Sequence, residues 1–282
     1  MFEIRAISNS GEDAIKRFPM TIAPSVFDLE IITDNLELEF SAEGRSNDEK
    51  NPEQWSYGDV EATFERFAWS NSDGWLESES GETALRFLPG NKMYIPFKPF
   101  ATDKTSTGYT IELELASRDV ADYDAVILSC MNEGRGLEVK SQQATFKSAL
   151  SEVTMQYKED ERVRITIVVE PLTLTRMMYI FINGVICSVS QYPEDDSFQQ
   201  NNPTTITIGS DKCGIDLYRL RFYSRVFSFN EQLNNFICDR STNAERFDAK
   251  KRNDIFDLAG NITLNSLPPE IPYLVMQCEE LP

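Results

Sequence analysis

Two glutamates at alternate positions of one strand-like segment are the residues in this sequence best placed to do chemistry. Glu112 and Glu114 alternate with Ile111, Leu113 and Leu115, so both carboxylates project from one face of a strand, about 7 Å apart. Carboxyl groups at such separations act as nucleophile and acid in glycoside hydrolysis. The competing interpretation, which we favour, is a solvated strand face opposite the apolar core face.

The absence of histidine limits every other catalytic scheme. None of the 282 residues is a histidine, so a Ser-His-Asp or Cys-His nucleophile and a histidine-ligated zinc site are excluded. The cysteines are widely spaced and form no C-x-x-C pair, so we expect reduced, mostly buried thiols and no zinc. They are Cys130, Cys187, Cys213, Cys238 and Cys278.

Four aromatic side chains could stack on sugar rings or fill a core. Trp69 and Trp75 flank the tight turn of residues 71–74, and we expect both to pack in the core. Trp55 and Tyr57 follow a polar loop, which makes them the better candidates for a ligand-binding surface.

The charge balance excludes several classes of partner. The chain has 46 acidic and 27 basic residues, a net charge of −19, which repels nucleic acid and anionic membrane surfaces. No apolar run approaches the roughly 18 residues of a membrane span, and the N-terminus lacks the pattern of a signal peptide. We therefore expect neither nucleic-acid binding nor membrane insertion.

Strand patterns dominate the chain and predict an all-β fold. Residues 109–116 alternate with period two, and the β-branched run of residues 163–170 is typical of a central strand. Asn183-Gly184 separates two apolar-alternating runs, which predicts a two-residue hairpin turn with positive φ at both positions. Short strands with frequent turns indicate an antiparallel two-sheet sandwich. Residues 230–239 are the one clear helix candidate, with Leu233, Phe236 and Ile237 on its apolar face.

Residues 204–240 carry a resemblance to a known fold family. Thr-Ile-Thr-Ile-Gly-Ser at 205–210 and Gly-Ile-Asp-Leu-Tyr-Arg-Leu-Arg-Phe-Tyr-Ser-Arg at 214–225 resemble the closing strands of laminin G-like and concanavalin A-like jelly rolls. The segment Tyr179-Ile-Phe-Ile-Asn183-Gly184 and the Gly74-Trp75 strand are similar to earlier strands of that family. The resemblance spans roughly residues 28–240. It implies the fold, but it does not choose among lectins, adhesion modules, glycanases and spacers.

The resemblance implies two further alternatives. Jelly-roll glucanases use a Glu-x-Asp-x-Glu strand, whereas here Glu114 stands at the middle position and Ala116 at the third, which argues against a glycanase. Members of the family often hold a structural calcium at one rim, where Asp211 or Asp216 could contribute. No motif supports that site, so we expect no cofactor and no metal.

A narrower resemblance is to multidomain surface or tail proteins of gut bacteria and their phages. In this interpretation residues 1–27 are the end of a preceding β domain or an N-terminal arm, residues 28–240 are the jelly roll, and residues 241–282 are a linker and the start of a following domain. The partners would be neighbouring domains of the same polypeptide, at an extracellular, cell-surface or virion location.

The sequence therefore predicts a binding module rather than an enzyme. We expect a non-catalytic, lectin-like recognition or adhesion domain with an extracellular or cell-surface glycan as ligand, and no catalytic residue. Glu112 and Glu114, with Trp55 and Tyr57, are the weak ligand-binding candidates. The alternatives are a purely structural spacer and a carboxylate-dependent glycanase.

Overall fold

The chain divides into two compact units, Leu29–Asn243 and a second unit made of Met1–Asp28 and Ala244–Pro282. The computed structural model describes residues 2–7, 13–18, 30–77, 82–98, 108–132, 135–148, 150–158, 161–171, 176–192, 205–241 and 276–277. The second unit contains a three-stranded antiparallel sheet of order β2-β1-β20. Its strands are β1 (Phe2–Ile7), β2 (Asp13–Phe18) and β20 (Met276–Gln277). Apart from Ser241, which ends a helix of the larger unit, the remaining residues of the predicted flanking segments lie outside the described ranges.

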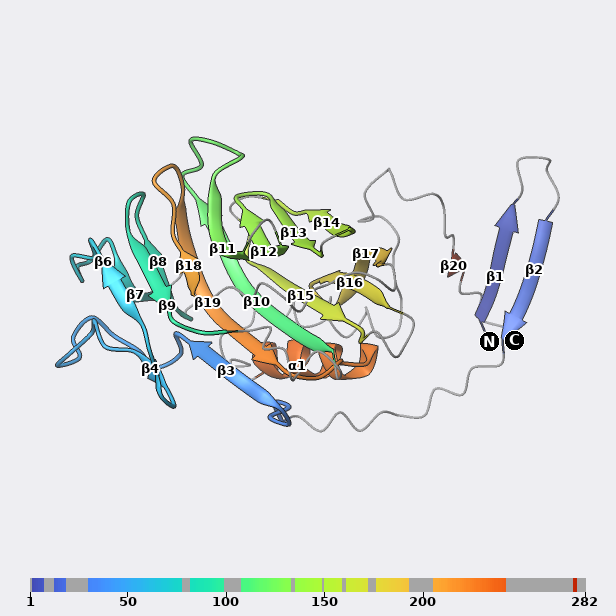
Figure 1. The fold of residues 1–282 in the computed structure, drawn as a ribbon, viewed down its shortest axis with the longest axis horizontal. Helices are drawn as coiled ribbons and strands as arrows, with labels where there is room; N and C mark the ends of the chain where they lie inside the picture. The colour runs from blue at the N-terminus through green and yellow to red at the C-terminus, as the bar shows by residue number, and fades with distance from the viewer. Residues whose placement is uncertain are drawn as a thin grey trace. The chain divides into compact units, whose positions relative to one another are not determined.

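The larger unit is a sandwich of two antiparallel sheets, as the sequence predicted (Figure 1). One sheet has seven strands in the order β14-β13-β12-β11-β18-β9-β6. These strands are β6 (Thr63–Glu65), β9 (Lys92–Ile95), β11 (Val126–Asn132), β12 (Arg135–Lys140), β13 (Gln143–Lys147), β14 (Glu152–Gln156) and β18 (Ile206–Ile208). A short separate hairpin joins β4 (Ser56–Tyr57) to β5 (Val60–Glu61).

The other sheet has eight strands in the order β17-β16-β15-β10-β19-β8-β7, with β3 also paired to β19. They are β3 (Leu36–Ser41), β7 (Gly74–Glu77), β8 (Thr83–Phe87), β10 (Tyr109–Arg118), β15 (Val163–Val169), β16 (Met177–Ile182), β17 (Val185–Gln191) and β19 (Gly214–Tyr223). Strands β15 and β16 are interior to the sheet, so the prediction of central strands at 163–170 and 179–182 is confirmed.

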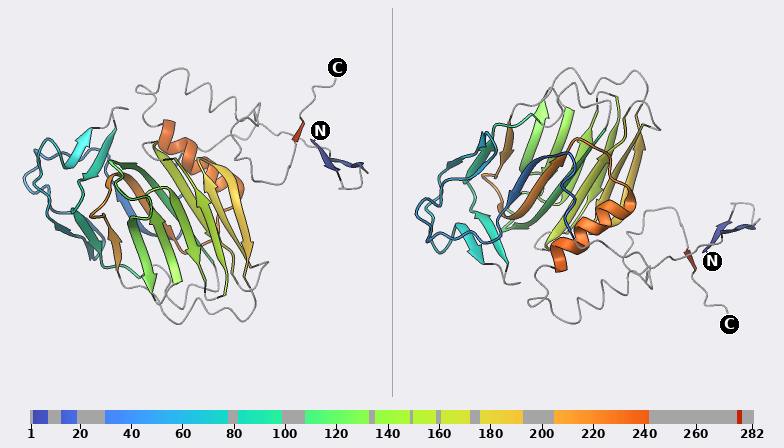
Figure 2. Two further views of the ribbon diagram at one scale, coloured as in Figure 1. Left: turned by 90° about the horizontal axis from the view of Figure 1, so that it is seen from above. Right: turned by 90° about the horizontal axis from the view of Figure 1, so that it is seen from below.

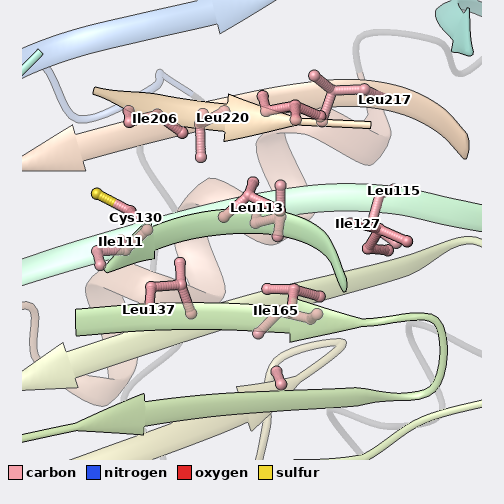
Figure 3. Packing of buried hydrophobic residues seen from close by; sticks show 14 of the residues in the cluster. Ile111, Leu113, Leu115, Ile127, Cys130, Leu137, Ile165, Ile206, Leu217 and Leu220 are labelled. Atoms are coloured by element: carbon pink, nitrogen blue, oxygen red, sulfur yellow. The ribbon is translucent and has the colours of Figure 1, made fainter. Parts of the chain in front are cut away.

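The core lies between the sheets and follows from strand alternation. On β10, Ile111, Leu113 and Leu115 are each 1% exposed, because every second side chain of a strand points to the same face. Figure 3 shows these side chains among others from both sheets, including Ile127, Leu137, Ile165 and Leu220. Trp75 is buried and Trp69 stacks on Phe67 with ring centroids 4.9 Å apart. Core packing of these two tryptophans is therefore confirmed.

The predicted hairpin turn joins β16 to β17. Ile182 pairs with Val185, and φ is 50° at Asn183 and 83° at Gly184. Both central residues have the positive φ that a two-residue primed turn requires. The Asn183 side chain also accepts a hydrogen bond from the Arg164 amide at 2.9 Å, which ties the turn to β15.

Helix α1 (Phe229–Ser241) lies on the outer face of the eight-stranded sheet, and strands β11 to β14 lie on the opposite side of the sandwich (Figures 1 and 2). Its start is a capping box: the Ser228 hydroxyl accepts from the Glu231 amide at 3.3 Å, and the Glu231 carboxylate accepts from the Ser228 amide at 2.8 Å. The predicted helix is thus confirmed. Within the described ranges, no helix has the length and apolar character that a membrane span requires.

Candidate functional site

The two glutamates of β10 belong to an alternating array of charges on the outer face of the eight-stranded sheet. Strand register places Glu114 between Arg164 of β15 and Arg219 of β19, and places Glu112 beside Arg221. Directly opposed side chains on neighbouring strands are within reach of one another. Arg219 Nη1 donates to Glu114 Oε2 at 3.1 Å, and Arg164 Nη2 lies 2.8 Å from Glu112 Oε2. Each glutamate is therefore neutralised by an arginine from a neighbouring strand.

Helix α1 supplies a third carboxylate to this array. Asn235 and Asp239 are four residues apart, so they share the helix face that lies on the sheet. Asp239 accepts two hydrogen bonds from Arg221, at 2.7 and 2.9 Å, and a third from Arg164. The Asn235 amide donates to both Glu112 oxygens at 3.2 and 3.3 Å. Polar side chains on one face of α1 thus bind the helix to the sheet.

We name these charged residues the buried ion cluster, because none of its side chains is more than 6% exposed. Its members are Glu112, Glu114, Arg164, Arg219, Arg221 and Asp239. Among these six members three carboxylates face three guanidiniums, and Arg162, which donates to Glu114 at 2.9 Å, is itself paired with Glu82. Burial by itself raises the pKa of Asp239, but the positive charges of Arg164 and Arg221 outweigh it and hold that pKa well below its ordinary value.

The expectation of a solvated strand face for Glu112 and Glu114 is therefore wrong. The two side chains are about 1% exposed. Asn235 of α1 and Arg164 hold the Glu112 carboxylate, and Arg162 and Arg219 hold the Glu114 carboxylate. A polysaccharide has no path to these carboxylates in this arrangement. The cluster provides neither a nucleophile nor a proton donor to solvent, and its geometry suits a structural role.

Trp55 and Tyr57, the two aromatic residues expected on the surface, also pack against the core. Trp55 is only 7% exposed and packs on Phe40, with ring centroids 5.4 Å apart. The prediction of a surface Trp55 is wrong, because the polar loop before it folds back over the core. Tyr57 is partly buried and packs against the same core. Burial and the negative charges of Glu39 and Glu37 raise the pKa of its phenol.

Asp211 and Asp216, the two candidate calcium ligands, differ in their burial and in their partners. Asp216 is fully buried, and its carboxylate is bound by Arg86 and Arg118 from neighbouring strands. Asp211 is 68% exposed and lies 3.7 Å from Lys92 Nζ. No group of three or more ligand-type side chains in the described ranges is arranged to hold a metal. None of the four cysteines placed there forms a disulfide; they are Cys130, Cys187, Cys213 and Cys238.

The candidate binding face is the outer surface of the seven-stranded sheet, which the sequence did not single out. Register connects one residue from every strand into a continuous row, here called the hydroxyl row. In order across the sheet it comprises Thr63, Tyr94, Thr207, Ser129, Glu138, Thr145 and Thr154. Their neighbours along each strand, such as Leu128 and Cys130, are buried in the core, so the row points outward.

Six of the seven residues in the row carry a hydroxyl, and Glu138 is its one acid. A hydroxyl both donates and accepts hydrogen bonds, and every hydroxyl residue of the row except the buried Thr145 is at least partly exposed. The Thr145 and Thr154 hydroxyls lie 3.1 Å apart, and the Tyr94 hydroxyl donates to Glu65 at 3.3 Å. The row was not detectable from single strands, because its members are scattered from 63 to 207. Only the register brings them together.

Comparison with known proteins shows the fold and no sequence family. No family model matches the sequence, and no curated protein matches it. Among solved structures, the binding domain of botulinum neurotoxin serotype D/C VPI 5993 is similar, with a TM-score of 0.52 and 13% identity over 72% of this chain. A tryptophan-to-alanine mutant of the HCR D/C VPI 5995 domain gives a TM-score of 0.53 with 12% identity over 72% of this chain. The matched region covers 51% of each of those chains.

These domains share the concanavalin A-like two-sheet sandwich of this chain. The fold resemblance found in the sequence is therefore supported by structure, whereas the narrower surface-protein or phage-tail context has no support from the comparisons. At 12–13% identity the likeness concerns the fold alone.

Proposed function

We propose that the sandwich is a non-catalytic, lectin-like module that binds an extended glycan along the hydroxyl row. The observation that carries this proposal is the strand register, which aligns a hydrogen-bonding side chain from each of seven neighbouring strands. Neighbouring strands lie about 4.8 Å apart, so the row extends for about 29 Å. A chain of several sugar units matches such a row better than a single small ligand does.

The chemistry of the row favours a polyhydroxylated ligand over other classes. Sugar hydroxyls need partners that both donate and accept, which Ser129, Thr154 and Thr207 supply from partly exposed positions. Tyr94 adds a half-buried aromatic ring at one end, and such a ring offers an apolar surface to a sugar. The net charge of −19 disfavours polyanions such as nucleic acid. The serotype D/C structure with the same fold is a binding domain, which agrees with this class of function.

The test is a glycan array followed by titration calorimetry on the hits. We expect saturable binding that Ser129→Arg weakens at least tenfold, because a long cationic side chain at the centre of the row displaces the ligand. Ser72→Arg is the matched control: it adds the same charge on the exposed loop before β7 and should leave affinity unchanged.

Two results would count against this assignment. Binding that Ser129→Arg does not alter would move the site away from the hydroxyl row. Absence of any glycan ligand on a broad array would favour the purely structural spacer. Thermal unfolding of both variants must stay near that of the parent, so that a loss of binding reports the site and not the fold.

We further propose that the module works at an extracellular, cell-surface or virion location, within a larger polypeptide. In this proposal residues 1–27 and 241–282 belong to neighbouring domains. Expression of residues 29–243, the larger compact unit, tests the arrangement, because an autonomous module should keep its melting temperature and its glycan binding. Loss of both in the shortened chain would show that the flanking segments are part of the same folding unit.

A further inference from the structure

One carboxylate lies at the centre of the hydroxyl row. Glu138 of β12 pairs with Ser129 of β11 on one side and with Thr145 of β13 on the other. Its neighbours along the strand, Leu137 and Val139, are both 0% exposed, so the Glu138 side chain points to the outer face with the rest of the row. Glu138 is partly exposed. A ligand that lies along the row therefore meets a negative charge near its middle.

The other two carboxylates on the outer face of this sheet differ from Glu138 in having partners. Glu65 of β6 accepts a hydrogen bond from the Tyr94 hydroxyl at 3.3 Å, and Glu152 of β14 lies 3.5 Å from Lys147 Nζ. Within the ranges that the structure describes, no side chain donates to Glu138 or forms an ion pair with it. Because a carboxylate accepts up to about four hydrogen bonds, Glu138 keeps its acceptor capacity for a ligand.

Two further lysines lie on the same face, and carboxylates in nearby loops hold both of them. Lys92 Nζ of β9 lies 3.7 Å from Asp211, and Lys140 Nζ of β12 donates to Asp124 at 2.9 Å. Asp211 follows β18 and Asp124 precedes β11. The hydrogen bond to Asp124 raises the pKa of Lys140, and the charge of Glu138 contributes less to that rise. Asp124, rather than Glu138, is thus the main counter-ion of Lys140.

A partly exposed carboxylate at this position favours one class of sugar over another. Adjacent hydroxyls of a neutral sugar can donate to the two oxygens of Glu138, and hydrogen bonds to an ionised acceptor are stronger than those between neutral groups. A uronic acid or a sulfated sugar would instead place a second negative charge beside Glu138, on a chain whose net charge is already −19. Like charges brought together at a binding site disfavour the wrong partner.

We propose that Glu138 makes the hydroxyl row specific for neutral glycans. Its carboxylate accepts hydrogen bonds from adjacent hydroxyls of a central sugar unit and excludes units that carry a carboxylate or a sulfate. This inference rests on the proposed function of the row and adds the class of sugar that the row takes. Attraction and exclusion come from the same side chain, so one substitution should weaken the first and relieve the second.

Matched pairs of oligosaccharides test the selectivity. The array carries gluco-, galacto-, manno- and xylo-oligosaccharides beside uronic acid oligosaccharides of the same length, and calorimetry measures the affinity of each pair that contains a hit. We expect the parent protein to bind a neutral member and to bind its acidic counterpart at least tenfold more weakly. The affinity for the neutral member should stay constant between 50 and 500 mM salt, because its binding forms no ion pair for salt to screen.

Glu138→Gln tests the residue, because it removes the charge and keeps the shape of the side chain. We expect the affinity for the neutral member to fall about tenfold, as for the loss of hydrogen bonds to a charged acceptor. The ratio of neutral to acidic affinity should fall toward one. Glu77→Gln is the matched control, since it removes the same charge from an exposed position on β7 of the other sheet. It should leave both affinities as in the parent.

Each contrary result has its own meaning. Neutral binding that Ser129→Arg weakens and Glu138→Gln leaves unchanged would overturn the role of Glu138 and keep the site on the hydroxyl row. An acidic oligosaccharide that binds as tightly as its neutral counterpart would overturn the selectivity in the same way. Binding that neither substitution affects, or no neutral ligand on the array, would overturn the proposed function and this inference with it. Melting temperatures of Glu138→Gln and Glu77→Gln near that of the parent ensure that the affinities report the site.

Discussion

Asp239 of α1 accepts two hydrogen bonds from the Arg221 guanidinium of β19, at 2.7 and 2.9 Å. This two-pronged pairing matches the planar geometry of both groups and is the strongest form of ion pair available to these side chains. It fixes the last turns of the helix at one position on the sheet. The capping box at Ser228 and the apolar contacts of Phe229 fix the other end.

Replacement of Asp239 by asparagine should destabilise the sandwich strongly. The change removes the carboxylate that Arg164 and Arg221 share and leaves the buried ion cluster with an excess of positive charge. Breaking a buried ion pair from one side costs about 3–5 kcal/mol. Urea unfolding measures the loss. Asp211→Asn is the control, because Asp211 is largely exposed and its replacement should change the free energy of unfolding by less than about 0.5 kcal/mol. Equal effects in the two variants would contradict a special role for the ion cluster.

Lowering the pH should reduce the free energy of unfolding through protonation of Asp239. The pKa of Asp239 is lower in the folded chain than the ordinary value near 3.9 of an unfolded aspartate. Its contribution is therefore complete above about pH 4 and is lost as the pH falls toward the folded pKa. Urea unfolding at pH 2–6 should show this decline, with a shallower slope for Asp239→Asn. Glu231 also has a lowered pKa, so part of the slope should remain in the variant.

Alanine at Gly184 should cost more than alanine at another glycine of similar backbone geometry. Gly184 has φ of +83°, and an added Cβ would lie 3.1 Å from Leu233 Cδ1 of α1. Gly58 has φ of +57° with no atom within 4 Å of the added Cβ. Both variants bear the strain of positive φ, about 1 kcal/mol, and only Gly184→Ala also presses on the helix. Equal melting temperatures would show that the turn and α1 are not in firm contact.

Truncation of Trp55 should affect stability rather than binding. Because the side chain is buried against Phe40, Trp55→Ala should cost about 3–5 kcal/mol of unfolding free energy. The glycan affinity of the fraction that remains folded should equal that of the parent. Loss of affinity with unchanged stability would restore Trp55 as a surface ligand contact.

Polysaccharide hydrolysis should be absent. Glu112 and Glu114 are enclosed by α1 and paired with arginines, so neither can reach a glycosidic bond. Reducing-end assays on laminarin and lichenan should stay at the level of the blank. Glu112→Gln should reduce stability without changing that result. Turnover that this substitution abolishes would establish a glycanase.

Local sequence patterns predicted the sandwich well, because its signals lie within single strands and turns. Asn183-Gly184 fixes a hairpin through backbone conformation alone, and residues 163–169 form a central strand through their β-branched content. The helix followed from the spacing of Leu233, Phe236 and Ile237. None of these predictions required knowledge of the neighbouring strands.

The candidate sites could not be predicted in this way, because each is assembled from several strands. The sequence of an alternating strand such as β10 identifies the apolar face that packs in the core. It does not predict which element covers the opposite, polar face. A signal was present: Arg219 and Arg221 repeat the two-residue spacing of Glu112 and Glu114 with opposite charge, as paired strands often do. The hydroxyl row has no such signal, because threonine and serine at alternate positions also occur on ordinary solvated strands.

The link between α1 and the hairpin turn determines where a pulling force would act. Gln232 of the helix donates to the Gly184 carbonyl at 3.0 Å, and Asp239 binds the sheet near the other end. Tension on the chain beyond Ser241 would therefore reach the sandwich first through the ion pairs of Asp239. The ion pairs of Asp239 would carry this force before the hydrogen bond between Gln232 and Gly184, and before any core strand. The helix thus gives the sandwich a mechanical anchor that bears load ahead of the hydrophobic core.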